Sequence, residues 1–252
     1  MRGTAGLRAI GAGVALIAAA AAGVAPAAPN AAPHRAPLAA ASAGKPASSS
    51  PKVFELTSES GSGKPVRWLA CKPIEYRINP AGMPAGMTPV VQRVMRTVAR
   101  QTGARFRYAG RTTHGFTSDS HARTPTIYVA FTGKAHVAKQ SFSWPGQIGV
   151  GGPAAGWYLT DSGSTFEAVT YGRVLLSTRF HGTRIGPGVT WEALILHEVG
   201  HALNLEHRSS PTAVMHASLT SRSPARFTTG EVEALKRTLQ TSGCDYAAWS
   251  KL

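Results

Sequence analysis

The chain has 252 residues, and its 27 lysines and arginines against 12 aspartates and glutamates give a formal net charge of +15. A hydrophobic fraction of 43% is enough for one core, which argues against a wholly disordered chain and against several domains. Only three aspartates occur, so calcium cages built from acidic side chains are not expected, and two cysteines are too few for a disulfide framework or a thiolate zinc cluster.

The N-terminal segment has the composition of an export signal. Arg2 and Arg8 precede an uncharged apolar run over residues 9–25, which is followed by small residues that suit cleavage. We therefore expect a signal peptide over residues 1–28 and a secreted, extracellular protein. The alternative is an uncleaved anchor. However, the run falls short of the roughly 20 residues of a spanning helix, and no stable membrane span is expected.

Residues 29–65 are rich in Ala, Pro, Ser, Gly and Lys and poor in large apolar side chains. Such a segment buries too little apolar surface to offset the entropy lost on ordering. It is predicted to be a disordered linker or a short pro-segment. Residues 66–252 are then predicted to form the one folded domain.

The first elements of this domain follow from the spacing of its apolar residues. A strand is predicted near the start, where Trp68, Ile74, Tyr76 and Ile78 appear with the period-2 spacing of a strand. Residues 89–100 have the apolar spacing of an amphipathic helix, which Gly103 is expected to end. Further strands are expected at residues 105–108, 126–131 and 168–177. The glycine-rich stretch 141–160 is either a plain surface loop or an edge strand.

Two further helices are predicted in the C-terminal part. Residues 190–203 have helical length and are apolar on nearly all sides, as expected for a buried helix. The last helix is expected to begin at Thr228, which forms a capping box with Glu231, and to continue to Leu239. The order of elements predicts an α+β fold.

The predicted buried helix reads His-Glu-Val-Gly-His over residues 197–201. Positions i and i+4 lie on one face of a helix, so His197 and His201 can share a zinc ion. Glu198 is rotated about 100° from His197 and lies beside the metal. It is therefore the expected catalytic residue, a general base for zinc-activated water.

A third zinc ligand must come from outside the helical face, and His207 is the candidate. The chain has to turn before it, and Asn204 stands where that turn is needed. After glycine, asparagine most readily accepts the left-handed conformation. One Zn²⁺ with three histidine ligands leaves a fourth position open for water.

This pattern, His197-Glu198-x-x-His201-x-x-Asn204-x-x-His207 followed by Met215, resembles the extended zinc signature of the metzincin metallopeptidases. Residues 68–108 and the final helix resemble the matrixin-like branch of secreted bacterial proteins. The resemblance implies a metzincin-like zincin fold, with a mixed twisted sheet, long helices, an active-site helix and a small C-terminal subdomain. Residues 66–252 would then be the catalytic domain.

The resemblance also assigns a role to Met215, that of the Met-turn residue, which lies as a hydrophobic floor under the histidines. The alternative is a flexible gap-filler of the core. Three departures from the family pattern stand out. Asn204 replaces the usual glycine, Ala217 stands where some members carry a tyrosine, and residues 26–66 contain no cysteine for a latch on the metal.

The two cysteines and the substrate strand are further expectations. Cys71 and Cys244 are predicted to form a disulfide across the ends of the domain, the alternative being a Cys71 thiolate on the zinc ion. The resemblance suggests that an extended substrate pairs with an edge strand at Ile148, Gly149 and Val150 through main-chain hydrogen bonds.

Together these features predict a secreted zinc metalloendopeptidase that hydrolyses peptide bonds of protein or peptide substrates. The alternative is an exported, non-catalytic, zinc-braced protein that binds anionic polymers. The positive surface allows weak binding of such polymers in either case. Nucleic-acid binding is not expected, since no interleaving of aromatic and basic residues stands out, and the chain is expected to be a monomer.

Overall fold

The computed structural model describes residues 66–70, 72–114, 125–132, 142, 147–159, 163, 165–178, 184–185 and 188–239. The predicted signal peptide, the predicted linker and both cysteines of the predicted disulfide lie outside the described residues. Among the helices that are described, none combines the length and the apolarity that crossing a membrane requires.

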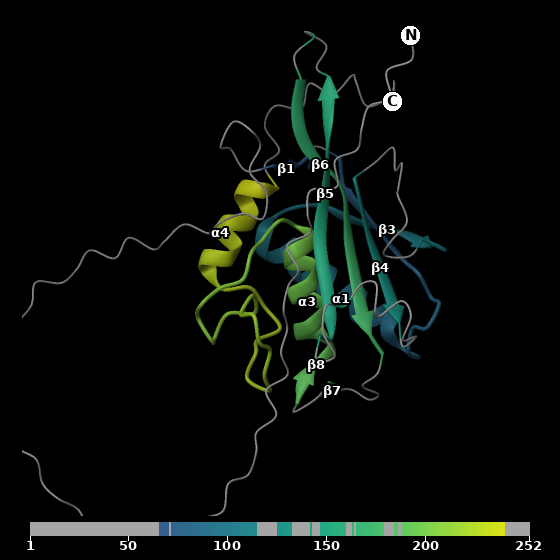
Figure 1. Cartoon of the computed structure of the whole chain (residues 1–252), viewed down its shortest axis with the longest axis vertical. Helices are drawn as coiled ribbons and strands as arrows, with labels where there is room; N and C mark the ends of the chain where they lie inside the picture. Colours follow the sequence, from purple (N-terminus) through teal and green to yellow (C-terminus); the bar gives the residue numbers. More distant parts are fainter. Residues whose placement is uncertain are drawn as a thin grey trace, which may run out of the picture.

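A six-stranded sheet forms the framework of the domain (Figure 1). Five strands run parallel in the order β1-β6-β4-β2-β3, and β5 pairs antiparallel with β6 on the side away from β1 and β4. The sheet is therefore mixed, as predicted, and β5 forms one of its edges within the described part. The strands are β1 (Arg67–Trp68), β2 (Ile74–Ile78), β3 (Phe106–Arg111), β4 (Thr126–Thr132), β5 (Gly149–Leu159) and β6 (Thr165–Ser177). Two short strands, β7 (Arg184–Ile185) and β8 (Val189–Thr190), pair separately.

Helices α1 (Met87–Thr102) and α3 (Trp191–Ala202) pack on each other, and α3 also packs against β5 and β6 (Figure 1). The apolar face of α1 is buried, and Gly103 ends the helix in the left-handed conformation at φ 76°, as predicted. Thr190 caps α3 by accepting the Ala193 N–H at 3.2 Å. Helix α4 (Thr229–Thr238) packs against α1 and begins with the predicted capping box. The main core lies between these helices and the sheet.

The strand predicted near residue 68 is in fact two strands. Trp68 lies in β1, which pairs with β6, whereas Ile74 begins β2, which pairs with β3 and β4. Pro73 separates them, because a proline has no N–H to continue a ladder. Of the two alternatives for the glycine-rich stretch, a surface loop or an edge strand, the structure has the edge strand β5 over residues 149–159.

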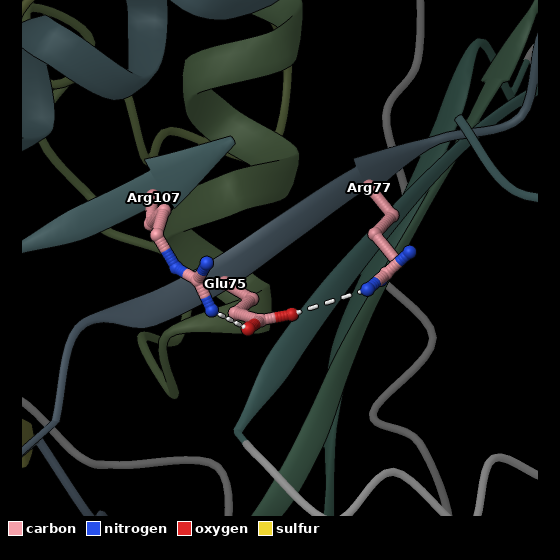
Figure 2. Close-up of polar contacts among 3 residues, drawn as sticks. All are labelled: Glu75, Arg77 and Arg107. Atoms are coloured by element: carbon pink, nitrogen blue, oxygen red, sulfur yellow. Dashed lines mark hydrogen bonds and ion pairs between the residues drawn. The ribbon is translucent and has the colours of Figure 1, made fainter. Parts of the chain in front are cut away.

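A buried carboxylate joins two of the parallel strands. Figure 2 shows Glu75 of β2 between Arg77 of the same strand and Arg107 of β3. Glu75 is only 5% exposed and pairs in register with Arg107. Because a buried charge is costly unless it is paired, the two arginines make this position tolerable. One of the few acidic residues is thus used to join the strands.

Glycines allow β5 to lie directly on α3. A Cβ atom on Gly151 would stand 2.2 Å from the main-chain carbonyl oxygen of Glu198. Such a contact is far inside van der Waals distance, and a backbone atom cannot rotate away as a side chain can. The edge strand therefore approaches the buried helix as closely as it does only because Gly151 has no side chain.

We expect Gly151→Ala to lower the free energy of unfolding by about 1–3 kcal/mol, because β5 would have to separate from α3. The matched control is Gly156→Ala on the same strand, where the added Cβ would meet a side-chain methyl group of Thr170 at 3.0 Å. The measurement is urea unfolding of both variants with unchanged m-value. Equal losses in the two variants would contradict the close approach of strand and helix.

Candidate metal centre

Three histidine side chains converge beside the edge strand. His197 and His201 lie one turn apart on α3, and His207 comes from the segment after the helix. Their ligand nitrogens all lie within 4.8 Å of one another. The Nε2 atoms of His197 and His201 are 3.0 Å apart. Two nitrogens bound at about 2.1 Å to a tetrahedral zinc ion would be roughly 3.4 Å apart, so the arrangement is close to that of a zinc site.

Backbone carbonyl groups fix how two of the imidazole rings are protonated. Nδ1 of His197 lies 2.6 Å from the Val214 carbonyl oxygen, and Nδ1 of His201 lies 2.7 Å from that of Leu205. A carbonyl oxygen can only accept, so each Nδ1 carries the hydrogen and donates it. In the neutral rings, both Nε2 atoms therefore direct lone pairs toward the same point, where a cation would relieve their repulsion.

Burial keeps these rings neutral. Loss of solvent lowers the pKa of His201 to about 3 and lowers the pKa of His197 well below its usual value, and the pKa of His207 is lowered for the same reason. A zinc ligand must be the neutral imidazole. Nε2 of His207 is also buried and has no hydrogen-bond partner within the described part of the chain. This set of three nitrogen donors fits zinc.

The turn that brings His207 back to the helix occurs at Asn204. This residue has a φ of 75°, in the left-handed region. The Leu205 N–H donates to the Gly200 carbonyl oxygen at 2.9 Å, which closes the end of α3. The Asn204 side chain donates to the Val66 carbonyl oxygen at 2.9 Å. The turn is therefore held by the strand segment at the beginning of the domain.

Glu198 is completely buried next to the triad. Neither of its carboxylate oxygens has a hydrogen-bond partner among the described residues. Burial accordingly raises the pKa of Glu198 well above its usual value. The side chain lies under Gly149 of β5, where an added Cβ would stand 2.3 Å from Oε1. An unpartnered buried carboxylate of this kind is typical of a functional group rather than of a structural one.

Met215 is buried under α3. Gly200 lies between His197 and His201 in the sequence, and a Cβ placed on it would stand 2.3 Å from the Met215 Sδ atom. The thioether therefore packs directly against this part of the helix. Met215 is also a member of the main core cluster, so this contact fits both the Met-turn role and the alternative of a core filler. The role of Met215 stays a prediction.

The predicted substrate residues lie at the start of the edge strand. Gly149 and Val150 are the first residues of β5, and Ile148 immediately precedes it and accepts the Ser177 N–H at 2.9 Å. The strand begins directly over Glu198. The alternative role of Cys71 as a metal ligand concerns a residue outside the described part.

Sequence reasoning missed the groups that support the ligands. The carbonyls of Val214 and Leu205 carry no sequence signal, because every residue has one. Glu231 was predicted only as a helix cap, but its carboxylate also accepts the Met215 N–H at 2.9 Å. The scarcity of acidic residues is the sequence feature that could have drawn attention to Glu231, because each glutamate in such a chain is a candidate for a specific role.

Comparison with known proteins identifies the class. The family model described as matrixin matches residues 68–237, and the chain belongs to this family. The protein is therefore a zinc metallopeptidase with a metzincin-like zincin fold, a hydrolase of protein or peptide substrates. No curated protein matches the sequence. A similar solved structure is archaemetzincin from Methanopyrus kandleri, with 16% identity and a TM-score of 0.41 over 67% of this chain and 96% of that chain.

The pKa shifts predict how the metal-free protein responds to pH. The lowered histidine pKa values make folding less favourable as pH falls below about 6.5, because the unfolded chain then binds protons that the folded state excludes. Glu198 acts in the opposite sense. Its raised pKa contributes stability below its ordinary pKa of 4.5, and this contribution is lost as pH rises toward the folded-state pKa.

Glu198→Gln should therefore gain stability relative to the unsubstituted protein as pH rises from 5 to 8 in the presence of a chelator. The gain is limited to about 1.4 kcal/mol per pH unit, the value for one proton. Urea unfolding at each pH measures it. Glu192→Gln, a change at a partly exposed position of the same helix, serves as control and should show no such trend. If the free energies of unfolding of Glu198→Gln and of the unsubstituted protein changed with pH in parallel, the raised pKa of Glu198 would be contradicted.

Proposed function

We propose that this zinc metallopeptidase is an exported endopeptidase in which Glu198 is the general base. The observation that carries the proposal is the buried carboxylate of Glu198, which has no hydrogen-bond partner within the described part and lies beside three converging histidine nitrogens. His197, His201 and His207 would hold the metal. Burial raises the pKa of this carboxyl group, which suits it to accept a proton near neutral pH.

The chemistry divides between the metal and the protein. When bound, zinc lowers the pKa of a water molecule from 15.7 toward about 7 and polarises the carbonyl group of the scissile bond. Glu198 takes the proton from the attacking water on a carboxylate oxygen. The same group then returns the proton to the leaving amine, so it is restored at the end of each cycle. The Nδ1–H···O=C bonds of His197 and His201 keep both rings oriented throughout.

The position of the edge strand β5 favours cleavage within a chain over cleavage at its ends. The main chain at Gly149 and Val150 lies next to Glu198, and β5 pairs with β6 on one side only among the described strands. An extended substrate that adds to the other side would be held by main-chain hydrogen bonds. Such pairing requires neither a free amino nor a free carboxyl terminus, so internal peptide bonds are the expected sites of cleavage.

The central experiment is digestion of casein, with mass spectrometry of the products. Glu198→Ala should bind one zinc ion per chain and lose about 10²–10⁴-fold in turnover, the usual contribution of a general base. Glu192→Gln, on the same helix but partly exposed and bound to Arg93 at 2.9 Å, should remain active. A chelator should stop cleavage and zinc should restore it. Full activity of Glu198→Ala would disprove the assigned base, and products trimmed only from their ends would disprove an endopeptidase.

Export is proposed from composition, with residues 1–28 as the signal and 66–252 as the catalytic domain. Expression of the full sequence in a secreting bacterium should yield extracellular protein whose N-terminus lies near residue 29, as read by N-terminal sequencing. Protein that keeps residue 1 and remains with the cells would contradict it. We further expect the exported protein to be a monomer whose strongly positive net charge gives weak, salt-sensitive binding to anionic surface polymers.

A further inference from the structure

We propose that Asn204 is a positioning residue for the candidate zinc ligand His201, acting through the turn that ends helix α3. Its side-chain amide donates to the carbonyl oxygen of Val66, 138 residues earlier in the chain, at 2.9 Å. The next residue, Leu205, carries the carbonyl oxygen that accepts the Nδ1–H of His201 at 2.7 Å. The start of the domain is thereby connected to a metal ligand through one turn. This role presupposes that the histidine triad binds zinc, as proposed above.

The left-handed conformation of the turn does not account for the asparagine. At a φ of 75°, glycine is the residue that has no steric cost, and the metzincin signature carries glycine at this position. Gly103 ends helix α1 in nearly the same conformation, at a φ of 76°. What asparagine adds at position 204 is therefore a side chain that reaches the carbonyl oxygen of Val66.

Burial makes this hydrogen bond costly to lose. Asn204 is 0% exposed and Val66 is 1% exposed, so water cannot take the place of either partner. A residue without the amide would remove a donor from a buried carbonyl oxygen. The turn is consequently held at the place where the amide and the carbonyl group meet.

A second buried hydrogen bond joins the same two segments. The indole N–H of Trp68 donates at 3.1 Å to the carbonyl oxygen of Ala202, the last residue of α3. Strand β1, which contains Trp68, is itself paired with β6. A Cβ on Gly172 of β6 would stand 3.1 Å from the Trp68 ring and 3.0 Å from the Ala202 Cβ, so sheet, ring and helix end are in close contact. Residues 66–68 are therefore a fixed support for the end of the helix.

The effect on His201 follows from the hydrogen bonds of the turn. The Asn204 N–H donates to the carbonyl oxygen of His201 at 2.9 Å, and the Leu205 N–H donates to that of Gly200 at 2.9 Å. If the turn shifted, the Leu205 carbonyl group would move with it, and its bond to Nδ1 of His201 would lengthen. The hydrogen bond to this nitrogen sets the orientation of the ring and its strength as a metal ligand.

His197 provides a comparison within the same site. Its Nδ1–H donates at 2.6 Å to the carbonyl oxygen of Val214, which lies beyond His207 in the chain and is not part of the turn at Asn204. Loss of the Asn204 amide should therefore affect His201 and leave His197 nearly unchanged.

The test uses the full chain and two measurements that do not depend on catalysis. The first is the zinc dissociation constant, from competition with a chromophoric chelator. The second is the NMR resonance of each histidine Nδ1–H in the zinc-loaded, ¹⁵N-histidine-labelled protein. Asn204→Gly keeps the left-handed turn and removes the amide. It should weaken zinc binding by about 10-fold and move the His201 resonance upfield, as expected for a longer hydrogen bond, with the His197 resonance unchanged.

Asn79→Gly is the matched control. The side-chain amide of Asn79 also joins two segments, because it donates to the carbonyl oxygens of Thr113 and His114 at 3.2 and 3.0 Å. Asn79 directly follows β2, which β4 separates from β6. This variant should unfold at lower urea concentration, but its zinc affinity and both histidine resonances should be unchanged.

Trp68→Phe tests the same connection from the other segment. It removes the indole N–H that binds Ala202 and retains an aromatic ring in the core. Zinc binding should weaken by less than about 10-fold, and the His201 resonance alone should move upfield. If Asn204→Gly does not fold, this variant alone decides the question, and unchanged values in it would overturn the proposal.

Two further results would overturn the proposal. One is unchanged zinc affinity with an unchanged His201 resonance in folded Asn204→Gly, which would show that the amide only braces the fold. The other is an equal upfield shift of the His197 and His201 resonances, which would show a general loosening of the site. If the unsubstituted protein binds no zinc, the proposed function fails as well, whereas normal zinc binding and casein cleavage in all variants would remove the role of Asn204 alone.

Discussion

The structure depends on placing neutral histidine rings in an apolar core with their Nε2 lone pairs directed to one point. Every residue of helix α3 except Glu192 is buried, so no water can satisfy the Nδ1 atoms of His197 and His201. Their acceptors are the carbonyls of Val214 and Leu205, which both lie after the helix. The segment that follows α3 must therefore fold back beneath it. The metal centre and the C-terminal subdomain are consequences of the same requirement.

Close approach of the backbone is the second condition. Gly149 and Gly151 let the edge strand lie on α3, and Gly200 leaves room for Met215 to pack against the same helix. The carboxylate of Glu198 is thereby enclosed under the strand that we propose to pair with substrate. A larger residue at either strand position would displace the base or the strand, so the place where substrate would bind and the place where the proton would be taken are coupled.

The shortage of acidic residues acquires a meaning from their environments. The three buried glutamates of the described part have three different surroundings. Glu75 is paired with arginines, and Glu231 accepts hydrogen bonds from the backbone and from a hydroxyl group. Glu198 alone among these three lacks a partner within the described part. An unpaired buried carboxylate opposes folding, which supports the role of general base that we propose for Glu198.

Local patterns were sufficient to predict α1, α3, α4 and the histidine motif, because each depends on residues within a few turns of one helix. The division of the first strand at Pro73, the position of β5 as an antiparallel edge and the supporting carbonyls depend on contacts between distant segments. Glu231 illustrates the limit. Its spacing from Thr228 predicts the cap, but the second oxygen is directed at a turn that only the tertiary fold brings near. In a chain with so few carboxylates, a helix cap that also binds the turn supporting His197 links the stability of α4 to the geometry of the candidate zinc ligands.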